Sequence, residues 1–215
     1  MGKKIIKEVK NIFSAVLDII YPADDKCIIC NAEDFIGICP LCKSNIKRIQ
    51  TQEEILSYGF YGGILKELIL AFKYDKNFTA GDILVDLLLS LIEEEKVDGD
   101  YICYVPMTKR SMKKRGFNQC EVIAEKIGDK LNIPVSKCLI KNKNTKEQKT
   151  LSKEERMKNI EGVFDIKNKS KIYNKKVILI DDVVTTGATL LECKKLLEKN
   201  AVEKITILTI AKSHI

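Results

Sequence analysis

Two adjacent carboxylates followed by a loop of hydroxyl-bearing and small residues form the stretch best suited to chemistry. Asp181 and Asp182 follow an apolar run, and the loop Thr185 to Thr189 (TTGAT) comes shortly after them. Carboxylates accept hydrogen bonds from sugar hydroxyls, whereas threonine hydroxyls and backbone N–H groups donate to phosphate oxygens. The stretch therefore predicts a sugar-phosphate site, with the sugar at the acids and the phosphate at the loop.

The elements that must position these residues are a strand and a helix. Val177–Ile180 is an apolar, β-branched run typical of a buried parallel strand, and a helix is expected from Gly187 to Lys199. Ligands of open α/β sheets bind outside the carboxyl ends of strands, where a helix N-terminus offers N–H groups to an anion. Two alternatives are an incidental acidic pair and an acidic metal site on another doubly wound sheet.

The run VILIDDVVTTGATL, from Val177 to Leu190, resembles the 5-phosphoribosyl 1-pyrophosphate (PRPP) motif of type I phosphoribosyltransferases. The resemblance implies that Asp181 and Asp182 hold the ribose 2- and 3-hydroxyls. It further implies that the loop holds the 5-phosphate, through Thr185, Thr186, Gly187, Ala188 and Thr189.

Four cysteines near the N-terminus have the spacing of a metal site. Two CxxC pairs, separated by eight residues, consist of Cys27, Cys30, Cys39 and Cys42. Two such turns supply four sulfurs to a tetrahedral, structural Zn²⁺. Two disulfides and an iron–sulfur cluster are the alternatives. The single histidine, His214, is expected to be a tail residue rather than a ligand.

A second cluster of charge follows the expected strand Tyr101–Val105. The segment from Met107 to Asn118 holds five basic residues and no acid, and it is expected to be a loop. A basic loop beside the phosphate loop suits a pyrophosphate group; a solvated lysine-rich loop is the alternative. We assign pyrophosphate binding to Lys109, Arg110 and Arg115.

The segment from Lys141 to Lys158 is polar, basic and without periodicity. Such segments are often lids that close over substrate, and disorder without function is the alternative. We expect closure to involve Arg156.

Composition limits the class of protein. The chain has 215 residues and is 45% apolar. Its formal charge of +7 suits an anionic ligand, but this is weak evidence because the excess of basic residues is mostly lysine. The sequence has no run of about 18 uncharged apolar residues, so no membrane span is expected. Charged residues interrupt the apolar positions from Ile5 to Ile20, where an amphipathic helix is expected instead of a signal peptide, either packed on the protein or surface-seeking. A cytoplasmic protein is predicted.

The remaining periodicity predicts alternating helices and strands. Helices are expected after a turn in Gly59–Tyr74, from about Gly81 to Glu94, and from near Asn118. Short strands are expected at Ile133–Leu139, at Gly162–Ile166 and at Ile205–Ile210, the last of the sheet. This order predicts an α/β fold with a doubly wound, mainly parallel sheet at 51–215, behind an amphipathic helix and zinc module at 1–50.

Three further stretches are similar to the ComF competence family. They are the CxxC pairs set after a helix ending in Tyr21-Pro22, the run VPMTKRSMKKRGFNQ from Val105 to Gln119, and the pattern Thr145, Gln148, Leu151, Arg156, Asn159, Gly162 and Phe164. The resemblance implies a type I phosphoribosyltransferase-like domain that binds PRPP with Mg²⁺. It also implies a role in natural transformation and the handling of single-stranded DNA, with DNA-uptake proteins as partners.

Two functions remain open from the sequence. One is a phosphoribosyltransferase, although no base-binding hood is recognisable. The other is a non-catalytic module that responds to PRPP or a nucleotide and binds single-stranded DNA, for which few aromatic residues, Phe117 being the obvious one, are available in the basic segments.

Overall fold

The computed structural model describes residues 25–50, 54–142 and 162–213. The expected helix Ile5–Ile20, the segment that contains Arg156 and His214 lie outside the described residues. The chain divides into two compact units, the first ending at Ser44 and the second beginning at Asn45. The predicted domain boundary at residue 50 stays a prediction.

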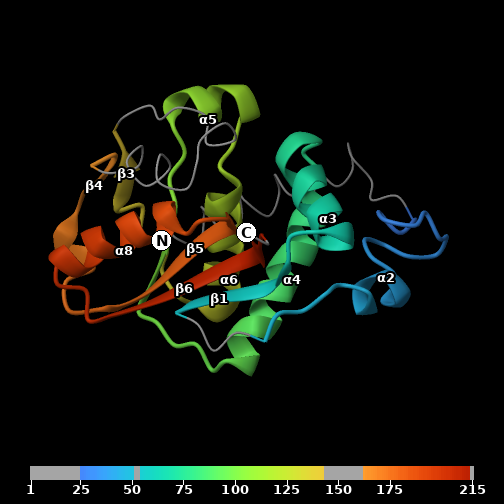
Figure 1. Ribbon diagram of the computed structural model, residues 1–215, viewed down its shortest axis with the longest axis horizontal. Helices are drawn as coiled ribbons and strands as arrows, with labels where there is room; N and C mark the ends of the chain where they lie inside the picture. Colours follow the sequence, from blue (N-terminus) through green and yellow to red (C-terminus); the bar gives the residue numbers. More distant parts are fainter. Residues whose placement is uncertain (1–24, 51–53, 143–161, 214–215) are drawn as a thin grey trace, which may run out of the picture. The chain divides into compact units, whose positions relative to one another are not determined.

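The second unit alternates strands with helices along most of its length (Figure 1). After α2 of the first unit (Pro40–Ser44), the elements in chain order are β1 (Ile55–Phe60), α3 (Gly63–Tyr74), α4 (Phe78–Glu94), β2 (Tyr101–Tyr104), α5 (Lys109–Arg115), α6 (Gln119–Leu131), β3 (Leu139–Lys141), β4 (Phe164–Ile166), the 3₁₀ turn η2 (Lys169–Lys171), β5 (Lys176–Val184), α8 (Ala188–Lys199) and β6 (Lys204–Lys212).

Four strands form one parallel sheet in the order β1-β6-β5-β2. The central strand β5 pairs with β6 over most of its length, from Lys176 opposite Lys204 to Val184 opposite Lys212. The sheet confirms the predicted α/β class. Strands β3 and β4 pair antiparallel in a separate two-stranded sheet, so the expected Gly162–Ile166 strand lies outside the parallel sheet.

Helices cover both faces of the parallel sheet, as a doubly wound fold requires (Figure 1). Side chains of a strand alternate between faces, so Val177 and Leu179 share one face of β5. They belong to the same buried cluster as Cys193 and Leu197 of α8. Helices α4 and α6 pack on the sheet as well, and the leucine-rich stripe of α4 is buried.

Two expectations about the elements are wrong, and one strand has no counterpart among the expected elements. Strand β1 was not expected. The basic segment after β2, predicted as a loop, contains α5, because Thr108 accepts a hydrogen bond from the Ser111 N–H at its start and Gly116 ends it in a left-handed conformation. The expected strand Ile133–Leu139 is a single bridge, from Val135 to Ile102, followed by β3.

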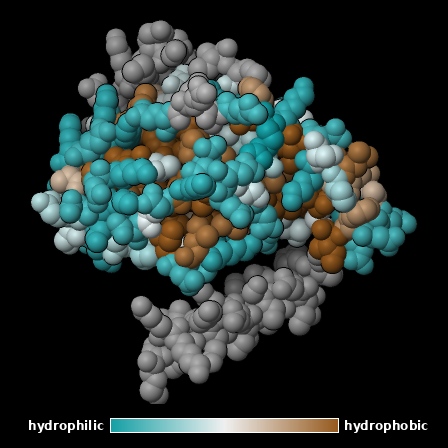
Figure 2. All heavy atoms as spheres, turned by 90° about the horizontal axis from the view of Figure 1, so that it is seen from below, coloured by the Kyte–Doolittle hydropathy of each residue, from teal (hydrophilic) through white to brown (hydrophobic). Residues whose placement is uncertain are grey.

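The surface of the described residues is mixed in character. On the face seen in Figure 2, hydrophilic residues are interspersed with smaller hydrophobic areas. Within the described ranges, no helix has the length and apolarity needed to cross a membrane.

Candidate functional site

The two acids lie near the carboxyl end of β5, where they line one pocket of about 760 Å³. Asp181 is partly exposed and Asp182 is buried. The Oδ1 atom of Asp181 accepts hydrogen bonds from the Asp182 N–H (2.9 Å) and from the Cys120 thiol (3.4 Å). Both carboxylates therefore face a cavity at the edge of the sheet where a ligand was predicted.

Asp182 is held by residues from two helices. Its Oδ2 atom accepts a hydrogen bond from Gln119 Nε2 (2.6 Å) and forms an ion pair with the ammonium of Lys73. Its Oδ1 atom accepts from the Val183 N–H at 2.6 Å. Asp182 thus connects β5 to α6 and to the end of α3.

The two acids have opposite pKa shifts. Burial, together with the charge of Asp182, raises the pKa of Asp181 to about 7. Burial would also raise the pKa of Asp182, but the Lys73 ammonium and the hydrogen bond from Gln119 hold that pKa below its ordinary value. Asp182 is therefore ionised at neutral pH, whereas the carboxyl of Asp181 gains and loses its proton near pH 7.

The Thr/Gly loop connects β5 to α8, as predicted. Gly187 caps α8 with φ +75°, a conformation that L side chains rarely adopt, and the Ala188 N–H approaches Thr186 Oγ1 at 3.4 Å. The loop lies at a helix N-terminus and lines the same pocket as the acids, through Thr185, Thr186, Gly187, Ala188 and Thr189.

Helix α5 supplies cations to this pocket. Arg110, Lys114 and Arg115 line it, whereas Lys109, also assigned to pyrophosphate, is not among the lining residues. Further lysines on the lining come from other elements and were not assigned from the sequence: Lys73, Lys76 and Lys141. The cavity thus has two acids at the end of β5 and cations around the N-terminus of α8. This arrangement suits a ligand whose hydroxyls meet the acids and whose phosphates meet the cations and the helix N-terminus.

An aromatic side chain also lines the pocket. Tyr74 ends α3 and is 57% exposed, and the Arg115 guanidinium lies 5.3 Å from its ring centroid. Phe78 of α4 is 47% exposed, and its ring packs against Phe117 with centroids 5.6 Å apart. Lys73 and Tyr74 end α3, and in the sequence they cannot be told from the residues of an ordinary helix end.

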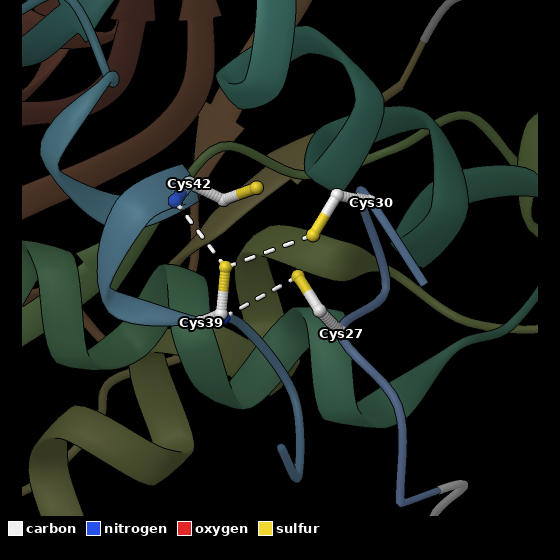
Figure 3. Close-up of side chains that lie close together, drawn as sticks. All are labelled: Cys27, Cys30, Cys39 and Cys42. Atoms are coloured by element: carbon white, nitrogen blue, oxygen red, sulfur yellow. Dashed lines mark hydrogen bonds between the residues drawn. The ribbon is translucent and has the colours of Figure 1, made fainter. Parts of the chain in front are cut away.

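The first unit brings its four cysteines together (Figure 3). The sulfurs of Cys27, Cys30, Cys39 and Cys42 all lie within 4.8 Å of one another. Those of Cys30 and Cys39 are 3.7 Å apart, too far for a disulfide bond and close to the roughly 3.8 Å that tetrahedral Zn–S bonds of about 2.3 Å imply.

Backbone N–H groups donate to two of the sulfurs and favour the thiolate form of Cys27. The Cys39 N–H donates to Cys27 Sγ (3.3 Å), and the Cys42 N–H donates to Cys39 Sγ (3.4 Å). Although burial opposes it, backbone N–H groups lower the pKa of Cys27 to about 6. The four residues therefore have the donor atoms and the spacing of a metal site.

Comparisons with known proteins agree with the geometry. A family model of the phosphoribosyl transferase domain matches residues 118–214. Competence protein F of Haemophilus influenzae is 30% identical over 80% of this chain and 78% of its own length. Competence protein ComFC of Bacillus subtilis is 29% identical, with 82% of this chain and 78% of that protein covered. The DNA utilization protein YhgH of Escherichia coli is 24% identical, over 77% and 75%.

Proposed function

Because the chain belongs to the competence protein F family, we propose that it binds PRPP in its phosphoribosyltransferase-type pocket and acts in DNA uptake during natural transformation. The observation that carries the ligand assignment is the single pocket that holds the acid pair, the Thr/Gly loop at the start of α8 and the cations of α5. Proteins of the DNA-uptake machinery are its expected partners.

The pocket residues divide among the parts of PRPP. Asp181 and Asp182 accept hydrogen bonds from the ribose hydroxyls, and the loop binds the 5-phosphate. Arg110 and Arg115, together with Lys109 of the same helix, bind the pyrophosphate, and the closure expected of the segment around Arg156 stays a prediction. Arginine suits this task because its guanidinium makes paired hydrogen bonds to phosphate oxygens.

Two metals follow from the proposal. Mg²⁺ would bind together with PRPP and neutralise the charge of the pyrophosphate. Its ligands there would be phosphate oxygens, which this ion prefers. Structural Zn²⁺ would occupy the four-cysteine cluster, whose sulfurs match its ligand number and spacing.

If the protein is a transferase, a nucleophile bonds to the anomeric carbon as the bond from that carbon to pyrophosphate breaks. The protein must then stabilise a cationic sugar and an anionic leaving group. The two acids face the sugar, and the cations of α5 face the leaving pyrophosphate. Pyrophosphate release on addition of a nucleobase or an oligonucleotide would identify this activity.

The test of the binding proposal is calorimetry with PRPP and Mg²⁺. We expect the double variant Asp181→Asn with Asp182→Asn to keep the fold, measured by circular dichroism, and to lose PRPP binding. A folded double variant with unchanged affinity would refute the ribose assignment.

A second candidate function is a PRPP- or nucleotide-responsive module that binds single-stranded DNA. The observation in its favour is the exposed ring of Tyr74 beside α5, because bases stack on aromatic rings while cations follow the phosphate backbone. Tight PRPP binding without turnover, together with oligonucleotide binding that Tyr74→Leu weakens and Tyr74→Phe preserves, would favour this module.

A further inference from the structure

Lys73 is a lysine whose position the proposed ligand contacts leave unexplained. It lies in the last turn of α3, its side chain is only 14% exposed, and its ammonium is paired with Asp182, whose side chain is 11% exposed. Removing an ammonium from water is costly unless a partner of opposite charge compensates it. The Lys73–Asp182 pair is therefore a specific feature of the pocket rather than a solvated surface contact.

The acid pair creates an electrostatic problem that this lysine addresses. Two neighbouring carboxylates in a desolvated place repel each other, and such a pair tends to retain a proton. The pKa of Asp181 is raised by burial and by the charge of Asp182, which is the effect expected of this repulsion. A carboxyl that keeps its proton offers fewer acceptor sites to a sugar hydroxyl.

The charged and titratable groups that face the pair come from four elements. Beyond the two acids of β5, they are Cys120 of α6, Lys141 of β3, Cys193 of α8 and Lys73 of α3. Cys120 donates to Asp181, and Lys141 acts on Asp181 without a hydrogen bond. In the described part of the chain, Lys73 is the cation that makes an ion pair with a carboxylate of the pair.

We propose that Lys73 is a positioning residue of the sugar site: its charge keeps Asp182 ionised and fixed, and it offsets part of the repulsion that Asp182 exerts on Asp181, so that the pair can accept ribose hydroxyls. The inference rests on the proposed function, since it concerns the binding of the same sugar phosphate. Gln119 completes the arrangement by donating to the carboxylate oxygen that Lys73 contacts. Lys73 acts through Asp182 and not through the reacting atoms.

The experiment measures the affinity for PRPP and Mg²⁺ between about pH 5.5 and pH 9, on the full chain, for Lys73→Met, Lys73→Gln and Lys73→Arg. An opposite charge at this distance changes a carboxyl pKa by about one to three units. We therefore expect both neutral variants to bind about tenfold or more weakly at pH 7 and to regain affinity at high pH. The midpoint of their pH profiles should lie about one unit or more above that of the wild type, and Lys73→Arg should restore it.

Two controls separate this role from a purely structural one. Lys66→Met removes the same charge from an exposed position of α3 and should change neither affinity nor profile. In a background of Asp182→Asn, Lys73→Met should add a much smaller loss, because its ion-pair partner is gone and only its weaker attraction to Asp181 remains.

The outcomes are distinguishable. Wild-type protein that does not bind PRPP refutes the proposed function before any variant is compared. A folded Lys73→Met or Lys73→Gln variant with the wild-type pH midpoint overturns the inference, as does a full additional loss in the Asp182→Asn background. If neither neutral variant folds, a carbon-13 NMR titration of the wild-type Asp182 carboxyl decides: a pKa below the ordinary aspartate range supports the role, and a raised pKa overturns it.

Discussion

The adjacent acids of β5 differ in the acceptor capacity that they have left for a ligand. Both oxygens of Asp182 already accept from protein donors. Of Asp181, Oδ1 accepts from Cys120 and from a backbone N–H, whereas among the described residues no donor reaches Oδ2. Asp181 therefore has one oxygen left to accept a hydrogen bond from a ligand. It is also the acid whose pKa is raised, so its ionised form is disfavoured in the free protein.

Ligand binding should accordingly depend on the protonation of Asp181. The carboxylate form accepts ribose hydroxyls, and the pKa of Asp181 is raised to about 7, so PRPP affinity should rise with pH up to about 7 and then level off. Calorimetry across this range, repeated in buffers of different ionisation enthalpy, should detect proton release on binding below pH 7. Asp181→Asn is the control, since the phosphates of the ligand titrate in both proteins; equal pH dependence of the two would contradict the assignment.

The same shift predicts an effect on stability. Since the folded-state pKa of Asp181 lies above the unfolded value, folding binds a proton between those values, and stability is lost as pH rises from about 4 to about 7. Asp181→Asn removes this loss and should make the free protein melt at a higher temperature than the wild type at pH 8. At pH 4, where Asp181 is largely protonated in both states, the difference in melting temperature should shrink.

At the scale of elements, one circuit of contacts joins the parts of the pocket. Asp182 of β5 contacts Gln119 of α6, Gln119 accepts from Arg115 of α5, and Arg115 lies over Tyr74 of α3. Lys73, next to Tyr74, returns the circuit to Asp182. The sugar site, the anion site and the exposed ring are thus held by the same side chains.

The turn into α8 should depend on Gly187 for both stability and binding. Gly187→Ala meets no atom closer than 3.9 Å, so its cost is the left-handed backbone, about 1–2 kcal/mol. Because the turn also aims the N–H groups at the phosphate, we expect PRPP affinity to fall about tenfold or more. Gly63→Ala, at another positive-φ position with open space, should cost similar stability in denaturant titrations and leave affinity unchanged; equal affinities for both variants would contradict a phosphate role for the turn.

The elements that sequence predicted are those with a strong local signal. The apolar run into the Thr/Gly loop fixed β5 and α8, and the start of α6 at Asn118 was expected from its sequence. Strand β1 was missed because its interior holds a polar residue, Ser57, whose hydroxyl forms a hydrogen bond with Thr209 of β6 across the sheet at 2.7 Å. Lys73 was likewise missed as a site residue because its partner, Asp182, is distant in sequence and comes near only in the fold.

At the scale of the whole molecule, the two units are stabilised in different ways. The second unit has a large apolar core around its sheet. In the described part of the first unit, the buried side chains are mainly cysteines, while Ile36 and Leu41 are each 71% exposed. A segment with so little buried apolar surface needs another source of stability, such as a metal.

Removal of the metal should therefore unfold the cysteine cluster and leave the sheet domain intact. We expect purified protein to contain about one Zn²⁺ per chain by elemental analysis, which also distinguishes zinc from iron. A strong chelator, or Cys39→Ser, should increase proteolysis within residues 25–44, while the melting transition of the second unit stays in place. Re-addition of Zn²⁺ after chelation should restore protection in the wild type but not in the variant, because only the wild type keeps all four sulfurs. Protection that persists without metal would show that the cluster folds on its own and would remove the physical reason for a zinc site.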